Sequence, residues 1–265
     1  MDDDGLLPRE SGEWIKRKHH FLDRYCAMFT RSMAKKWHRI YLDVMAGPGR
    51  CQIKPTGEIC PGSPFVALAH DFDEYRFFEA DSEAVDALRQ RVAVHAKADR
   101  CSVVGADWTK TVTTPSFNLP QGSLTLAFVD PTGISQVPWS AVKAPALSNR
   151  RIDIMFTIQY AMGINLNAHQ YLASNADETA ADAFAGGKQW KDRLGPNLNV
   201  RDALISQFVA NMGDLGFSSH KWQLISLPNG SGLYYLCLFS RSQLALDFWD
   251  KVVLKDEKGQ RSLGF

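Results

Sequence analysis

Short apolar runs alternate with amphipathic stretches along most of this 265-residue chain. Five apolar runs predict strands, at residues 40–45, 75–78, 101–104, 124–129 and 151–158. Apolar residues at helical spacing predict helices at residues 82–94, 200–212 and 244–254. Two final apolar runs, residues 222–227 and 233–239, flank a turn-forming segment and predict an antiparallel hairpin. The pattern therefore predicts an α/β fold, a seven-stranded, mostly parallel, doubly wound Rossmann-like sheet with helices on both faces.

The first predicted strand ends in an acidic, glycine-rich turn, Asp43-Val44-Met45-Ala46-Gly47-Pro48-Gly49. Glycine lets backbone N–H groups approach a ligand without a Cβ atom in the way, so the turn predicts a nucleotide-like cofactor, with an ordinary strand-to-loop connection as the alternative. A dinucleotide fingerprint needs a third glycine where this chain has Gln52, which disfavours a nicotinamide dehydrogenase. The Asp43 carboxylate would attract an ammonium group and repel a pyrophosphate. The turn resembles the first motif of class I S-adenosylmethionine-dependent methyltransferases. The residues expected to bind the methionine end are Asp43, Ala46, Gly47 and Gly49.

An acidic residue lies at or just after the end of each of the first four predicted strands, at Asp43, Glu79, Asp107 and Asp130. The carboxyl ends of parallel strands meet at one edge of a sheet, and ligands bind at that edge. Glu79 would accept hydrogen bonds from the ribose. Asp107 would accept from the adenine amine, with the Trp108 indole over a face of the ring. Trp108 fits a core position equally well. Any single acid could instead be a helix cap, but four in register favour one ligand site.

The segment Asp130-Pro131-Thr132-Gly133 resembles a partial copy of the fourth motif of amino-methyltransferases. In that motif an Asp or Asn, two prolines and an aromatic residue receive the nucleophilic amine. Asp130 and Pro131 are therefore the expected catalytic residues. Thr132 and Gly133 depart from the motif, and this departure favours the alternative of a non-catalytic cofactor- or substrate-binding subunit.

The chain divides into an N-terminal basic amphipathic helix region, residues 1–40, and a methyltransferase-like Rossmann domain, residues 41–265. Insertions at residues 50–62 and 162–196 enlarge the second part. The first insertion delays the next helix, for which Ser63 is the expected N-cap and Pro64 the first position. This insertion would either fold over the cofactor or form a loop on the surface. The second insertion is polar, and its place after the fifth strand suits a substrate lid.

Positive charge concentrates near the start of the chain, although the formal net charge is only +1. Eight Lys and Arg residues lie between positions 16 and 39, against the single acid Asp23. Helical spacing of apolar residues in this segment predicts one amphipathic helix with a basic outer face. Such a face would either bind nucleic-acid phosphates or act as a solubilising surface. The residues proposed for phosphate contact are Lys16, Arg17, Lys18, Lys35 and Lys36.

Several classes of protein are disfavoured by composition. No apolar run approaches the roughly 20 residues that a membrane-spanning helix needs, and the acidic start lacks the features of a signal peptide. We therefore expect a cytoplasmic protein without a membrane partner. Five cysteines, an odd number with no closely spaced metal-type pair, predict free thiols and no metal site.

The assembled features resemble the three-Cys-motif partner (TcmP) family. The resemblance comprises the basic N-terminal helix, the strand and turn at residues 41–49, the delayed Gly62-Ser63-Pro64, Phe78-Glu79 and the segment 128–133. It covers most of the chain and is strongest before residue 139. It implies a methyltransferase-like Rossmann fold and a separate partner protein with a three-cysteine, radical S-adenosylmethionine-like motif. The sequence hypothesis is therefore an S-adenosylmethionine-dependent methyltransferase, with nucleic acid favoured slightly as the methyl acceptor.

Overall fold

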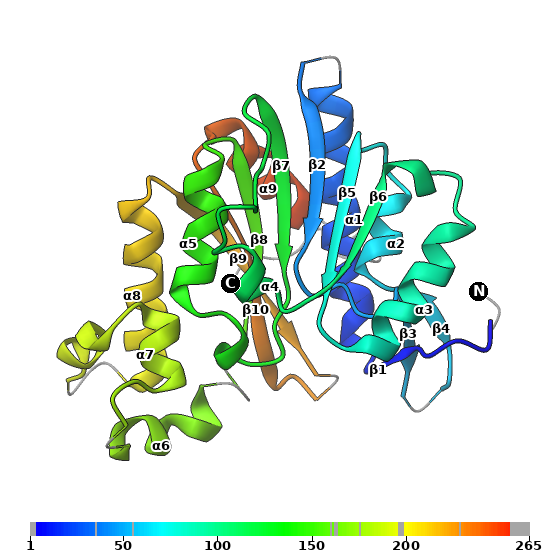
Figure 1. The fold of residues 1–265 in the computed structure, drawn as a ribbon. Coiled ribbons are helices and arrows are strands. Elements are labelled where there is room, and N and C mark those ends of the chain that lie inside the picture. Colours follow the sequence, from blue (N-terminus) through cyan, green and yellow to red (C-terminus); the bar gives the residue numbers. More distant parts are fainter. Residues whose placement is uncertain are drawn as a thin grey trace.

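The computed structural model describes residues 4–34, 36–54, 56–159, 161, 164–174, 176–195, 199–227 and 229–254. A twisted seven-stranded sheet with the order β6-β5-β2-β7-β8-β10-β9 forms its centre (Figure 1). The seven strands are β2 (His38–Asp43), β5 (Glu74–Glu79), β6 (Cys101–Gly105), β7 (Ser123–Val129), β8 (Ile152–Ile158), β9 (Ser218–Ser226) and β10 (Gly232–Ser240).

Strand direction agrees with the predicted fold class. Neighbouring strands from β6 to β8 pair in parallel, whereas β10 lies antiparallel to both β8 and β9. The hairpin of β9 and β10 thus places the last strand of the chain between β8 and β9. Every residue of β8 is buried, as expected for an inner strand covered on both faces. The α/β, doubly wound, mostly parallel sheet with a terminal antiparallel hairpin is confirmed.

Helices cover both faces of this sheet and form two hydrophobic cores (Figure 1). One core receives side chains from α1 (Trp14–Met33), α2 (Ser63–Leu68), α3 (Ser82–Ala93) and α9 (Gln243–Val253). The other receives side chains from α4 (Trp108–Thr111), α5 (Trp139–Ser148), α7 (Ala180–Ala185) and α8 (Val200–Asp214). Helix α1 is therefore packed into the same core as the sheet.

The first insertion forms a small sheet beside the glycine turn. Strands β1 (Arg9–Ser11), β3 (Arg50–Ile53) and β4 (Ile59–Pro61) pair in the order β1-β3-β4. The predicted N-cap of the following helix is wrong by one residue, because Gly62 caps α2 and Ser63 is its first residue. Only glycine fits at position 62, since a Cβ atom there would lie 2.9 Å from the Gly49 carbonyl carbon. The Ser63 hydroxyl instead bonds to Asp43.

The second insertion folds into short helices. Its described elements are η3 (Asn165–Asn167), α6 (Ala168–Ala173), α7 and η4 (Lys188–Arg193). Thr179 and Asp182 form a reciprocal capping box at the start of α7. Phe184 and Trp190 are completely buried, and the Trp190 indole N–H donates to the Asp182 carboxylate over 2.8 Å. The insertion is thus anchored to the α5 and α8 face of the sheet.

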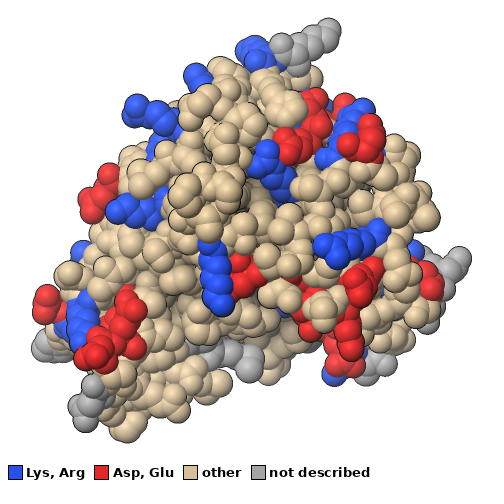
Figure 2. All heavy atoms as spheres, viewed as in Figure 1, with Lys and Arg blue, Asp and Glu red and all other residues tan. Residues whose placement is uncertain are grey.

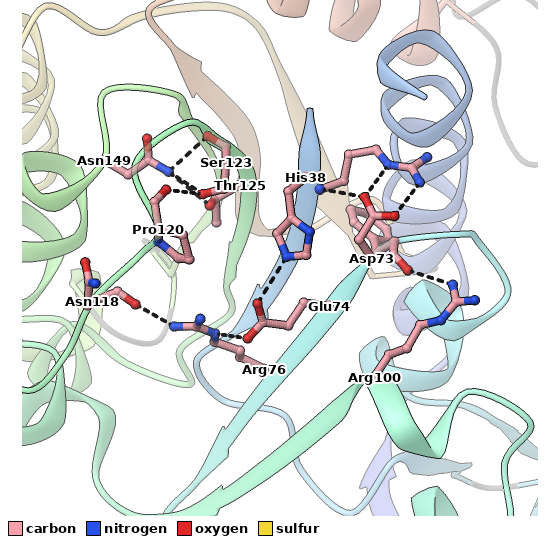
Figure 3. A network of polar contacts seen from close by, with 12 residues as sticks. His38, Asp73, Glu74, Arg76, Arg100, Asn118, Pro120, Ser123, Thr125 and Asn149 are labelled. Carbon is pink, nitrogen blue, oxygen red and sulfur yellow. Dashed lines mark hydrogen bonds and ion pairs between the residues drawn. The ribbon is translucent and has the colours of Figure 1, made fainter. Parts of the chain in front are cut away.

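Polar side chains at the amino ends of the strands bond to one another (Figure 3). Arg39 of β2 donates two guanidinium hydrogen bonds of 2.9 Å to Asp73, which precedes β5. Asn149 donates to the hydroxyl of Ser123 at the start of β7. The first contact ties β2 to the segment that enters β5, and the second ties β7 to the segment that enters β8.

The basic segment at residues 16–39 differs from its prediction in two ways. Helix α1 ends at Met33, and Arg39 lies in β2, buried and paired with Asp73. Lys18 faces inward and is only 4% exposed, because its side chain pairs with Asp130 under the helix. Lys18 is therefore unavailable for phosphate contact. Lys35 lies outside the described residues.

Candidate cofactor and acceptor site

A cavity of about 590 Å³ opens at the carboxyl edge of the sheet. It lies where the glycine turn after β2, the ends of β5 and β7, and the loop after β6 converge, with the segment leading into β1 on one side. Figure 2 shows acidic side chains gathered below the middle of this face of the molecule. The sequence-predicted site residues that line the cavity are Gly47, Glu79, Asp107, Trp108 and Asp130.

The two glycines of the turn have left-handed backbone conformations, with φ of +62° at Gly47 and +86° at Gly49. Gly47 lines the cavity, and a Cβ atom there would meet only Arg9 Cδ, at 3.7 Å. At Gly49 a Cβ atom would overlap the side chains of Phe65 and Leu88 at 2.7 and 2.9 Å. Gly49 therefore serves packing. Together with Ala46 it lines a much smaller neighbouring hollow instead of the main cavity.

Glu79 joins the ends of β2 and β5. Its carboxylate accepts a 2.7 Å hydrogen bond from the Gly47 N–H group and two more from the N–H groups of Ala80 and Asp81. The acid expected at the ribose is thus held rigidly against the glycine turn. Carboxylate oxygens accept about four hydrogen bonds in total, so capacity for a ligand hydroxyl remains.

Asp107 and Trp108, between β6 and α4, line another part of the cavity. Asp107 caps α4, since its Oδ1 accepts from the N–H and the hydroxyl of Thr109 at 3.0 and 2.7 Å. The Trp108 indole belongs to the core and also borders the cavity, so its contact with adenine stays a prediction. The Trp108 indole N–H is buried without a hydrogen-bond partner among the described residues.

Asp43 occupies a different position from the one expected. Its carboxyl group is fully buried beneath the turn, where it accepts hydrogen bonds from the Tyr41 hydroxyl and the Met45 N–H group. Burial raises the pKa of Asp43 to about 7. The contact of Asp43 with the methionine ammonium stays a prediction, and this buried position gives it no support. Asp43 lies outside the cavity lining and stabilises the turn from below.

Asp130 borders the cavity and also pairs with Lys18 of α1. Because side chains alternate along a strand, Asp130 falls on the same face of the sheet as Phe128, which is the face that α1 covers. Burial raises the pKa of Asp130, but the positive charges of Lys18 and Arg9 outweigh it, so the pKa lies below its usual range. Pro131 is buried and lies outside the cavity lining.

Two buried hydroxyl groups lie close to Asp130. The Thr157 and Tyr234 hydroxyls interact with the Asp130 carboxyl group and share its face of the sheet. The Lys18 ammonium lies 5.4 Å from the centre of the Tyr234 ring. The Tyr234 hydroxyl oxygen is buried without a hydrogen-bond partner among the described residues. A buried group with unused hydrogen-bonding capacity points to a bound water or ligand.

Sequence reasoning missed Arg9 and the inward position of Lys18. Arg9 reaches the cavity from β1, a three-residue strand that is too short to produce a detectable apolar pattern. Lys18 was detectable, because residues 15, 18, 22 and 25 lie on one face of a helix and the other three are apolar. A lysine within such a face predicts a buried ionic partner.

The described residues hold neither a membrane-spanning helix nor a cluster of metal-binding side chains. None of their helices combines the length and hydropathy needed to cross a membrane. They contain no group of three or more His, Cys, Asp or Glu side chains arranged to bind a metal ion. The five cysteines form no disulfide bond. Cys51 of β3 and Cys60 of β4 lie opposite each other in the antiparallel register of these two strands.

Comparisons with known proteins support the fold. No family model and no curated protein matches the sequence. Among solved structures, the crystal structure of protein LPL1258 from Legionella pneumophila has a TM-score of 0.57 and 14% identity, covering 91% of this chain and 90% of that one. Magnesium protoporphyrin IX methyltransferase from Synechocystis PCC 6803, with bound SAH, has a TM-score of 0.48 and 11% identity, covering 86% and 84%. The likeness to LPL1258 is a likeness of fold alone, and it agrees with the doubly wound α/β architecture that the strand order of this chain defines.

Proposed function

We propose that this protein is an S-adenosylmethionine-dependent methyltransferase whose cofactor binds in the 590 Å³ cavity. The observation that carries the proposal is convergence: Gly47, Glu79, Asp107 and Asp130 follow four neighbouring parallel strands and border one cavity at their carboxyl edge. When bound, S-adenosylmethionine supplies an electrophilic methyl group. The cavity falls within the roughly 300–1,000 Å³ typical of cofactor sites.

The residues around the cavity suit an adenosine with a charged amino-acid tail. Glu79 would accept from the ribose hydroxyls, because a carboxylate fixed by backbone donors needs little reorganisation to bind them. Asp107 would accept from the adenine amine, and Trp108 would contact the ring. Gly47 allows the methionine end to approach the backbone.

Asp130 would position the methyl acceptor. Because its pKa is lowered, its carboxylate stays ionised and accepts a hydrogen bond from an acceptor N–H or O–H group, while serving poorly as a proton-abstracting base. The unpartnered hydroxyl of Tyr234 adds hydrogen-bonding capacity beside it. This arrangement favours an acceptor that already has a reactive lone pair, such as an amine.

The acceptor class that we favour is nucleic acid. The support comes from exposed basic residues near α1, of which Lys16 and Lys36 are accessible, although Lys16 also pairs with Glu58 over 2.6 Å. Replacing both lysines by Glu should reduce retention on heparin, whereas unchanged elution would remove this support. Lys18 is left out of the variant, since a Glu at its position would face Asp130.

We also propose, from the sequence resemblance, that the chain works with a three-Cys-motif, radical S-adenosylmethionine-like partner protein. The alternative function is a non-catalytic subunit of that partner. Two observations favour the alternative: Lys18 already occupies one oxygen of Asp130, and Thr132 and Gly133 depart from the amino-methyltransferase motif. Co-elution of the two purified proteins on gel filtration tests the partnership, and separate elution would argue against it.

Calorimetry with S-adenosylmethionine and S-adenosylhomocysteine tests cofactor binding. We expect wild type to bind both and Glu79→Ala to lose about 10- to 100-fold in affinity, the usual effect of removing charge-assisted hydrogen bonds. The matched control is Glu178→Ala, which removes an exposed carboxylate of the second insertion. No heat with either ligand would refute the proposal. Binding without any turnover in the presence of RNA and the partner would select the non-catalytic alternative.

A further inference from the structure

A second cavity of about 470 Å³ lies at the opposite, amino edge of the sheet. It is enclosed by the end of α1, the start of α9 and the first residues of β7 and β8. The proposed methyltransferase function does not use it. Because the sheet separates its two edges by the length of the strands, a ligand here would be separate from the cofactor.

Asp153 of β8 provides a buried acid in the lining of this cavity. It is only 5% exposed, and its Oδ2 accepts a 2.9 Å hydrogen bond from the Tyr25 hydroxyl. Its Oδ1 accepts from the Ser240 hydroxyl. Each carboxylate oxygen has a further lone pair, so Asp153 can still accept hydrogen bonds from a ligand.

Aromatic side chains form much of the cavity wall. Phe29 of α1, Trp37 before β2 and Phe248 of α9 all border the space. The Arg151 guanidinium lies over the Trp37 ring, 4.2 Å from its centre. Flat aromatic and guanidinium surfaces favour a flat ring system in the ligand, because stacking adds to apolar burial.

The charge of the cavity lining is mostly positive. Its ionisable cations are Lys36, Arg150, Arg151 and Arg241, against Asp153 as the one carboxylate among the described lining residues. Lys36, Arg150 and Arg151 are exposed, whereas Arg241 is held by carbonyl oxygens of Leu215 and Ala146. Exposed lysine and arginine side chains at a cavity mouth favour an anion, and phosphate above all.

We propose that this cavity binds a guanine nucleotide, with the base beside Asp153 and the aromatic wall and the phosphate at Lys36, Arg150 and Arg151. Guanine presents two neighbouring N–H donors on one edge, which match the two oxygens of a carboxylate. An organic cation would be repelled by the three exposed basic residues. A fatty acid would bury its apolar chain against the Asp153 carboxyl group, which costs free energy.

The nucleotide has two possible sources, a free mononucleotide or a guanosine within single-stranded RNA. Calorimetry with GMP, AMP and guanosine tests the recognition itself. We expect GMP to bind at least fivefold more tightly than AMP and at least tenfold more tightly than guanosine. A G-containing RNA tetramer that binds tenfold more tightly than GMP identifies RNA as the source, whereas equal or weaker binding identifies the mononucleotide. Failure of GMP to bind, or equal binding of GMP and AMP, would overturn the proposal.

Variants locate the GMP site. Arg150→Glu and Arg151→Glu change exposed side chains and should each weaken GMP binding about tenfold without unfolding the protein. Asp153→Asn should abolish the preference for GMP over AMP. The control is Glu79→Ala in the first cavity, which should leave GMP binding unchanged. If only Glu79→Ala weakens GMP binding, the nucleotide occupies the first cavity and the inference fails. Binding of S-adenosylhomocysteine to the same variants tests the proposed function separately.

Discussion

Lys18 of α1 and Asp130 after β7 form a buried ion pair, although 112 positions separate them in the chain. The pair connects the N-terminal helix to the residue that we propose for acceptor positioning. It places a positive charge beside Asp130, and Arg9, which lines the cavity, adds another. The packing of α1 and the charge of the candidate site are therefore coupled.

Removing one member of this pair should destabilise the protein. Lys18→Met would leave the Asp130 carboxylate buried without its main partner, which costs about 3–5 kcal/mol. Urea unfolding measures the loss. Lys16→Met is the control, because Lys16 is exposed and its variant should unfold like wild type. The double variant Lys18→Met/Asp130→Asn should lose less than the sum of the two single variants, and strict additivity would contradict a direct pairing.

The raised pKa of Asp43 predicts a pH dependence of stability. Between its unfolded pKa near 3.8 and its folded pKa of about 7, the folded state holds a proton that the unfolded state releases. The Asp43 contribution therefore favours folding at low pH and is lost as pH rises, by about 1.4 kcal/mol per pH unit. Asp43→Asn should remove this decline, so its stability relative to wild type should rise between pH 4.5 and 6.5. A constant difference would contradict the raised pKa. Asp153 is present in both proteins, so its own titration cancels.

Alanine substitutions at Gly47 and Gly49 of the turn should lower the stability of the protein by different amounts. Gly47→Ala places a side chain at positive φ with open space around it, and it should cost about 1–2 kcal/mol. Gly49→Ala adds overlap with Phe65 and Leu88, for about 1–3 kcal/mol more. Gly57→Ala is the control, because its φ is also positive and no atom lies within 4 Å. Thermal unfolding should rank Gly49→Ala as the least stable, and equal midpoints would show that the turn relaxes.

The stability of the second insertion should depend on its buried Trp190. Trp190→Ala removes a fully buried indole and its hydrogen bond to Asp182, which should cost about 3–5 kcal/mol. Leu166→Ala is the control from the same insertion, since Leu166 is 72% exposed. Chemical unfolding measures both variants. If Trp190→Ala unfolds like Leu166→Ala, the insertion contributes little to the folded core.

The expectation of a substrate lid remains a prediction. No described residue of insertion 162–196 lines the first cavity, although α7 packs against η2 (Ile134–Gln136), whose residues Ser135 and Gln136 do line it. The sequence suggested a polar lid, because Asn, Gln and Gly residues recur along the insertion. The few apolar residues, Phe184 and Trp190 among them, determine the packing, because both are completely buried.

The amino-acid sequence by itself determined the strands of the seven-stranded sheet, the main helices, the terminal hairpin and the edge at which Glu79, Asp107 and Asp130 meet. These features follow from local periodicity and from the geometry of parallel strands, which brings their carboxyl ends together. Only the tertiary structure decided that Asp43 lies beneath the turn, that Lys18 points inward and that Arg9 reaches the cavity. Burial and charge pairing depend on residues distant in the chain, and no local pattern specifies which of them come into contact.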